Sequence, residues 1–113
     1  MFFGFNEPEV PEVEADEVKR AMDAKESFVL LDVRTEGEYV RAKLAGSINI
    51  PLDKVTCDIQ DVVPKKDTKV YVYCLSGSRS VHAVDAMTRM GYTNVFNMSH
   101  GLLGWRAKYF PVE

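Results

Sequence analysis

The sequence lacks several features that mark specialised classes of protein. Its 113 residues include only two cysteines, Cys57 and Cys74, and these do not have the close spacing that is typical of zinc ligands. It has no long apolar run, and no basic segment precedes its short apolar start, so neither a membrane span nor a signal peptide is predicted. The expected location is the cytoplasm, where both cysteines would be free thiols.

Basic residues are not in excess either. Lysine and arginine number 14 against 17 aspartates and glutamates, which gives a net charge of -3 and no electrostatic reason to bind nucleic acid. A hydrophobic fraction of 46% with 27% charged residues is ordinary for a globular protein. The length suits one domain, and no internal repeat is visible. We therefore expect one folded domain without nucleic-acid or membrane partners.

The apolar pattern predicts strands that alternate with helices. Pro8 and Pro11 stand among glutamates, which indicates an N-terminal arm over residues 1–12 and a domain over residues 13–113. The alternation predicts an α/β fold in which helices cover both faces of a mainly parallel sheet of about five strands. Strands are expected at residues 28–31, 47–50, 69–73 and 94–97, and helices at residues 15–24, 36–42, 52–60, 102–107 and over a segment that ends at Gly91.

The segment from Cys74 to Ser80 carries the clearest chemical signal. It connects a predicted buried strand to a helix, which is where ligands bind in open parallel sheets. Gly77 and the small serines allow successive backbone amides to turn toward one point, and the helix start adds a positive dipole end, so the loop predicts a cradle for an anion. Arg79 adds a full positive charge. We expect such a site to lower the pKa of the Cys74 thiol and make it nucleophilic.

An ordinary buried cysteine at a strand end is the alternative reading of Cys74. The combination of strand, cysteine, glycine, arginine and helix within so short a segment favours a reactive thiol. Cys74 and Arg79 are the candidate catalytic residues. The candidate binding residues are those of the cradle itself, Leu75, Ser76, Gly77, Ser78 and Ser80.

Four stretches together resemble the rhodanese family. Residues 74–80 are similar to its active-site loop, Cys-x-x-Gly-x-Arg-Ser, and residues 30–39 resemble its Asp-Val-Arg signature. Residues 46–51 resemble its Gly-Ala-x-Asn-Ile-Pro segment, and residues 91–105 resemble its closing strand and Gly-x-x-x-Trp turn. The resemblance extends over most of the predicted domain and implies a three-layer rhodanese-like fold.

The resemblance also implies a sulfurtransferase. Cys74 would take a sulfur atom from a donor such as thiosulfate and hold it as a persulfide, whose negative charge the loop amides and Arg79 would stabilise. A thiophilic acceptor would then remove the sulfur, and that acceptor would be cyanide, a thiol or a sulfur-accepting protein. The implied reaction requires neither a metal nor an organic cofactor.

Two alternatives on the same fold stay open. A non-catalytic or sulfur-relay module would bind a protein partner, although the presence of both Cys74 and Arg79 favours catalysis. A phosphatase or arsenate reductase would need a larger cradle. Here four residues separate Cys74 from Arg79, one fewer than in cysteine phosphatases, and the smaller ring suits a single sulfur atom.

Outside the loop the signals are weaker. Asp32 and Arg34 end a predicted strand near the expected site and form either a structural ion pair or a support for the loop. Lys43 and His100 replace residues that are usual in the family, and either change the charge at the mouth of the site or are simply solvated. Cys57 has no glycine loop or cation beside it, so a packing role is expected rather than that of a resolving thiol.

Overall fold

Runs of strand-forming residues give the chain a parallel sheet. The computed structural model describes residues 7–113. Within this range the five strands are β1 (Glu12–Val13), β2 (Val29–Asp32), β3 (Ile48–Asn49), β4 (Val70–Tyr73) and β5 (Val95–Met98). Their order across the sheet is β1-β5-β4-β2-β3, and each neighbouring pair is parallel. The central strand β4 is buried along its whole length, as expected for a strand that is covered on both faces.

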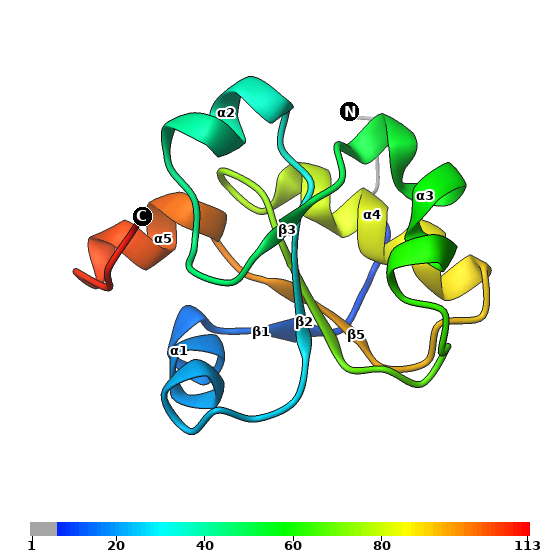
Figure 1. The fold of residues 1–113 in the computed structure, drawn as a ribbon, viewed down its shortest axis with the longest axis horizontal. Coiled ribbons are helices and arrows are strands. Elements are labelled where there is room, and N and C mark those ends of the chain that lie inside the picture. The colour runs from blue at the N-terminus through cyan, green and yellow to red at the C-terminus, as the bar shows by residue number, and fades with distance from the viewer. Residues whose placement is uncertain (1–6) are drawn as a thin grey trace, which may run out of the picture.

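Helices cover both faces of this sheet. They are α1 (Ala15–Asp23), α2 (Glu36–Arg41), a short 3₁₀ helix η1 (Leu52–Lys54), α3 (Val55–Val62), α4 (Ser78–Arg89) and α5 (Gly101–Ala107). In Figure 1, α1 and α5 lie on one side of the sheet and α3 and α4 on the other, while α2 lies beyond the end of β2. The predicted three-layer α/β fold with a parallel five-stranded sheet is confirmed.

The alternation of side chains along the strands divides the apolar core into two clusters. Val70 and Val72 of β4 belong to the cluster under α3 and α4, whereas Tyr71 and Tyr73 belong to the cluster under α1 and α5. Successive side chains of a strand point to opposite faces, so the residue after Tyr73 returns to the first face. Cys74 accordingly lies in the cluster under α3 and α4.

The connections bring two loops together at the carboxyl ends of the central strands. The chain passes from β2 outward to β3, and from β4 outward to β5 in the opposite direction. Open α/β sheets bind ligands at such a switch point, beyond the carboxyl ends of the strands. Asp32 is paired in register with Tyr73, and the Val33 N–H donates to the Tyr73 carbonyl at 3.0 Å. The segments that follow β2 and β4 therefore start side by side.

The predicted strands and helices are present with small shifts at their ends. Residues 1–6 of the predicted arm lie outside the described residues. The last residue of the predicted arm lies in a strand, because Glu12 and Val13 form β1 and pair with Asn97 and Met98 of β5. The segment predicted as a helix over residues 52–60 starts as the 3₁₀ helix η1 and continues as α3 to Val62.

The side chain of Cys57 is exposed, so its predicted packing role is wrong. Val55 and Ile59 are the buried residues of α3. They lie four positions apart on one helical face, which leaves Cys57 on the other face.

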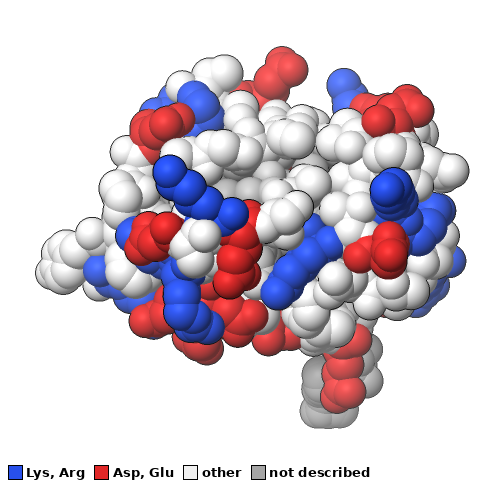
Figure 2. Space-filling model, turned by 60° about the horizontal axis from the view of Figure 1, so that its bottom comes forward, with Lys and Arg blue, Asp and Glu red and all other residues white. Residues whose placement is uncertain are grey.

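Acidic and basic side chains are mixed on the molecular surface. Figure 2 brings the bottom of Figure 1 forward, and on this face lysines and arginines lie among aspartates and glutamates below an uncharged area in the upper middle. The face therefore carries no large area of a single charge. None of the helices that residues 7–113 form has the length and apolar character needed to cross a membrane.

The burial of α3 predicts the effect of two substitutions. Ile59→Ala should lower the free energy of unfolding by about 2–5 kcal/mol, because it leaves a cavity in the core. Cys57→Ala should change it by less than about 0.5 kcal/mol, because the side chain is exposed. Urea denaturation followed by circular dichroism measures both values. Similar losses for the two variants would contradict this orientation of the helix.

Candidate active site

The loop between β4 and α4 encloses the thiol of Cys74. Gly77 has a φ of 103°, in the left-handed region that glycine adopts readily, and it turns the chain back over the sulfur. The Gly77 N–H donates to Cys74 Sγ with an N–Sγ distance of 3.1 Å. The N–H and hydroxyl of Ser80 both donate to the same sulfur, with their nitrogen and oxygen each 3.4 Å from it. Three donors thus meet at one fully buried sulfur atom.

These hydrogen bonds determine the pKa of the Cys74 thiol. Burial raises the pKa, because removal from water disfavours the charged form. The hydroxyl and N–H of Ser80, together with the backbone amides of Gly77 and Ser76, favour the thiolate and outweigh burial. The pKa of Cys74 is therefore below its ordinary value, and the site is built to hold negative charge on sulfur.

The first turn of α5 supports this loop from behind. The Leu102 N–H donates to the Cys74 carbonyl at 2.9 Å, and the Leu103 N–H donates to the Leu75 carbonyl at 3.0 Å. Gly101 permits this approach, because a Cβ atom there would clash with both carbonyl oxygens. The sequence interpretation gave Gly101 no part in the site. The Gly-x-x-x-Trp spacing was the available signal, and the structure shows that this turn packs against the loop between β4 and α4.

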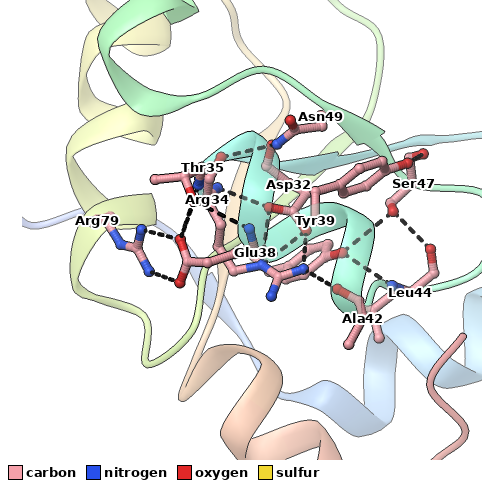
Figure 3. A network of polar contacts seen from close by, with 11 residues as sticks. Asp32, Arg34, Thr35, Glu38, Tyr39, Ala42, Leu44, Ser47, Asn49 and Arg79 are labelled. Carbon is pink, nitrogen blue, oxygen red and sulfur yellow. Dashed lines mark hydrogen bonds and ion pairs between the residues drawn. The ribbon is translucent and has the colours of Figure 1, made fainter.

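Arg79 pairs with Glu38, a residue that the sequence interpretation did not include in the site. Its two terminal nitrogens, Nη1 and Nη2, donate to Glu38 Oε1 and Oε2 at 2.8 and 3.0 Å (Figure 3). This two-pronged geometry fixes the guanidinium as well as attracting it. The Glu38 hydrogen bond raises the pKa of Arg79, and the nearby Cys74 adds a smaller electrostatic contribution. Within residues 7–113, no hydrogen bond joins the guanidinium to Cys74 itself.

The start of α2 holds Glu38 in place. The Thr35 hydroxyl caps the helix by accepting from the Glu38 N–H at 3.2 Å, and the Thr35 N–H donates to Glu38 Oε1 at 2.9 Å. This reciprocal capping box uses the same carboxylate that binds Arg79. The Arg79 hydrogen bond lowers the pKa of Glu38 to about 2, so the carboxylate is charged at neutral pH.

Asp32 and Arg34 form a buried ion pair beside this network (Figure 3). Their side chains are 0% and 3% exposed, and Arg34 Nη2 lies 2.7 Å from Asp32 Oδ2. The same Nη2 donates to the Ala42 carbonyl at 2.5 Å. Burial lowers the pKa of Arg34, but the bonds to Asp32 raise it by more. The pair joins the end of β2 to the segment after α2. It therefore links the backbone on both sides of α2, the helix that carries Glu38.

Lys43 and His100, which replace residues usual in the family, have different surroundings. Lys43 lies with its Nζ 5.3 Å from the centre of the Tyr39 ring, and its backbone pairs with that of Glu113. His100 is exposed and lines a pocket of about 260 Å³ together with residues 76–78 of the loop between β4 and α4. The structure therefore brings His100, rather than Lys43, to the edge of the loop.

A comparison with protein-family models identifies the family of the chain. The family model for the rhodanese-like domain matches residues 14–108. The chain belongs to the rhodanese-like domain family. The resemblance drawn from the sequence is thereby confirmed, and the matched range contains the loop after Cys74, the Asp32–Arg34 pair, Glu38 and the α5 turn.

Relatives of this rhodanese-like domain carry related names. The thiosulfate sulfurtransferase PspE of Escherichia coli (strain K12) is 42% identical over 67 residues, which cover 59% of this chain and 64% of PspE. The putative sulfur carrier protein YrkF of Bacillus subtilis (strain 168) is 32% identical over 103 residues, which cover 91% of this chain and 55% of YrkF. The chain thus spans less than two thirds of the length of these relatives.

A solved structure shares the fold of the rhodanese-like domain over nearly the whole chain. A thiosulfate sulfurtransferase from Pseudomonas aeruginosa superposes with a TM-score of 0.85 at 27% identity, covering 91% of this chain and 20% of that one. Sequence and structure together indicate sulfur transfer as the chemistry of the family. In the part of this chain that the structure describes, no three His, Cys, Asp or Glu side chains gather as metal ligands.

The Glu38–Arg79 pair predicts a pH-dependent stability. The pKa of Glu38 is about 2 in the folded protein and 4.5 ordinarily, so its ion pair stabilises the fold above the ordinary value and is lost as the pH falls toward 2. Near neutral pH, Glu38→Gln should be less stable than the wild type by about 1–2 kcal/mol, and the difference should shrink as the pH falls. Urea denaturation over this range measures it.

Glu36→Gln is the matched control, because Glu36 is an exposed carboxylate in the first turn of the same helix. Its effect should stay small over the whole pH range. A Glu38→Gln deficit that does not change with pH would contradict the assignment.

Proposed function

We propose that this chain is a sulfurtransferase in which Cys74 carries a sulfur atom as a persulfide from a donor such as thiosulfate to a thiophilic acceptor. The observation that carries the proposal is the convergence of the Gly77 N–H and of the Ser80 N–H and hydroxyl on Cys74 Sγ. Such a site stabilises negative charge on sulfur, which the reaction requires at each stage. The names of the relatives support the same chemistry.

In the first step, the Cys74 thiolate attacks the outer sulfur of thiosulfate. A new S–S bond forms to Cys74, the S–S bond of the donor breaks, and sulfite leaves with the electron pair. A thiolate and a thiosulfate dianion thus become a persulfide anion and a sulfite dianion, and no proton is transferred. A thiol with a lowered pKa and a set of fixed donors is therefore sufficient for this step.

In the second step, the acceptor attacks the outer sulfur of the persulfide and Cys74 leaves as a thiolate. A low pKa makes a thiol a better leaving group, so the hydrogen bonds that activate Cys74 for attack also assist its release. We assign Arg79 a supporting electrostatic role in both steps, with its guanidinium fixed by Glu38. Cyanide, a small thiol or an acceptor protein each fit this step, and neither a metal nor an organic cofactor takes part.

A sulfur-relay role is the second candidate. The observation that favours it is the 32% identity to a putative sulfur carrier protein over 91% of this chain. A relay would use the same Cys74 persulfide and would differ only in the use of proteins as donor and acceptor. We further propose a cytoplasmic location for either role, because a thiol that must be free between reactions suits a reducing compartment.

The phosphatase alternative fits the loop less well. The donors of the loop contact Cys74 Sγ itself, with N–Sγ distances of 3.1 Å for Gly77 and 3.4 Å for Ser80. Only four residues separate Cys74 from Arg79. A loop closed so tightly around one atom suits a sulfur better than a tetrahedral phosphate.

The proposal predicts a persulfide on one of the two cysteines. After incubation with thiosulfate, the intact protein should gain the mass of one sulfur atom, because Cys74 is a stabilised thiolate. Cys57→Ser should gain the same mass, because Cys57 is an exposed thiol outside the loop, whereas Cys74→Ser should gain nothing. Intact-mass spectrometry measures all three. Loading that persists in Cys74→Ser, or no loading from thiosulfate, polysulfide or a persulfide donor, would overturn the proposal.

A further inference from the structure

A buried asparagine lies on β5 beside the loop between β4 and α4. Asn97 is 1% exposed and is paired in register with Val72 of β4, two residues before Cys74. Val95, two positions before it on β5, belongs to the apolar cluster under α3 and α4. Since residues two positions apart on a strand share a face, the Asn97 side chain lies on the same face of the sheet as Cys74.

The backbone of Asn97 is held by a strand on each side. On one side β5 pairs with β4, and on the other side Asn97 is opposite Glu12 of β1. The Asn97 N–H donates to the Pro11 carbonyl at 2.8 Å. The short strand β1 thus makes β5 an internal strand of the sheet, and it fixes the point from which the Asn97 side chain extends.

The side-chain amide of Asn97 contacts the loop through one of its two polar atoms. Its Nδ2 donates to the Gly77 carbonyl at 3.5 Å. Its Oδ1 is buried and has no hydrogen-bond partner among residues 7–113. A buried acceptor without a donor costs free energy, and an apolar side chain of similar shape would avoid that cost. Stability therefore does not account for an amide at this position, and the bond to Gly77 is what distinguishes it from an apolar residue.

The hydroxyl of Ser80 is shared between two acceptors. Its oxygen lies 3.4 Å from Cys74 Sγ and 3.2 Å from the Gly77 carbonyl oxygen. A hydroxyl carries one hydrogen, so it donates fully to only one of these acceptors at a time. The Gly77 carbonyl therefore competes with the sulfur for this hydrogen.

We infer that Asn97 is a positioning residue for Cys74: it binds the Gly77 carbonyl and so leaves the Ser80 hydroxyl free to donate to the sulfur. The inference rests on the proposed function and adds a residue to its site. While Cys74 is a neutral thiol, the Ser80 hydroxyl can donate to the Gly77 carbonyl. When the thiol loses its proton to solvent, the hydroxyl turns to the charged sulfur, because a hydrogen bond to a charged acceptor is the stronger one. Asn97 Nδ2 then remains as a donor to the carbonyl that the hydroxyl has left.

The midpoint of the Cys74 titration tests this role. All variants carry Cys57→Ser, which leaves Cys74 as the only thiol, and the rate of alkylation by iodoacetamide is measured against pH. Asn97→Leu should raise the midpoint by about half a pH unit to one pH unit, because the thiolate loses part of a hydrogen bond. The urea midpoint of this variant should stay the same or rise, because a buried acceptor without a donor has been removed.

A double variant tests whether Asn97 acts through Ser80. Ser80→Ala should itself raise the midpoint of alkylation, because it removes the hydroxyl. Adding Asn97→Leu to Ser80→Ala should raise the midpoint further by less than about a third of the shift that Asn97→Leu causes alone, since the hydroxyl through which it acts is gone.

Two more variants complete the set. Asn97→Ala removes the amide without any risk of overpacking, and it should raise the midpoint of alkylation as Asn97→Leu does. Asn94→Leu is the matched control, because it makes the same chemical change at the opposite end of β5, where the Asn94 amide donates to the Asp67 carbonyl at 3.3 Å. It should leave the midpoint of alkylation unchanged.

The outcomes separate this inference from the function on which it rests. Alkylation needs no sulfur donor, so a protein that never loads sulfur refutes the proposed function without changing the midpoints. An unchanged midpoint in both Asn97→Leu and Asn97→Ala refutes the role of Asn97, and a lower urea midpoint with unchanged alkylation would make the residue purely structural. Equal shifts with and without the Ser80 hydroxyl also refute the inference, because Asn97 would then act independently of that hydroxyl.

Discussion

The hydrogen bonds to Cys74 Sγ are the interactions on which the rest of the site depends. A fully buried thiolate would be disfavoured by its removal from water, and the Gly77 and Ser80 donors reverse that effect. The fold supplies them in a simple way. The alternation of β4 directs Cys74 toward α4, and the left-handed backbone of Gly77 turns the following amides toward the sulfur.

The surrounding structure keeps these donors in position. On one side, the first turn of α5 binds the carbonyls of Cys74 and Leu75, an arrangement that needs glycine at position 101. On the other side, Arg79 at the start of α4 is fixed by Glu38. Glu38 is fixed in turn by the cap of α2, and the buried Asp32–Arg34 pair anchors the segments on either side of that helix. Polar networks of this kind are costly when incomplete, so each member constrains the others.

Much of this architecture was predictable from the sequence, because it depends on local patterns. The apolar runs indicated the strands, and the segment from Cys74 to Ser80 indicated an anion cradle from residue types alone. The Glu38–Arg79 pair was not predictable in this way, since its partners are 41 positions apart and meet only through the sheet. β1 was missed because two residues are too few to show alternation. The burial of Cys57 was predicted wrongly, because the apolar residues of α3 show no clear periodicity. Packing against the core decides which face of this helix is buried.

The most direct test of the account is a pH titration of the backbone amides of Gly77 and Ser80 by nuclear magnetic resonance. If these amides hold the Cys74 thiolate, their proton shifts should titrate together, with a midpoint below that of the same thiol in the denatured chain. The transition should be absent in Cys74→Ser and should move to higher pH in Ser80→Ala, which loses one donor. Amide shifts that do not follow the thiol, or a midpoint at or above that of the denatured chain, would contradict the central claim.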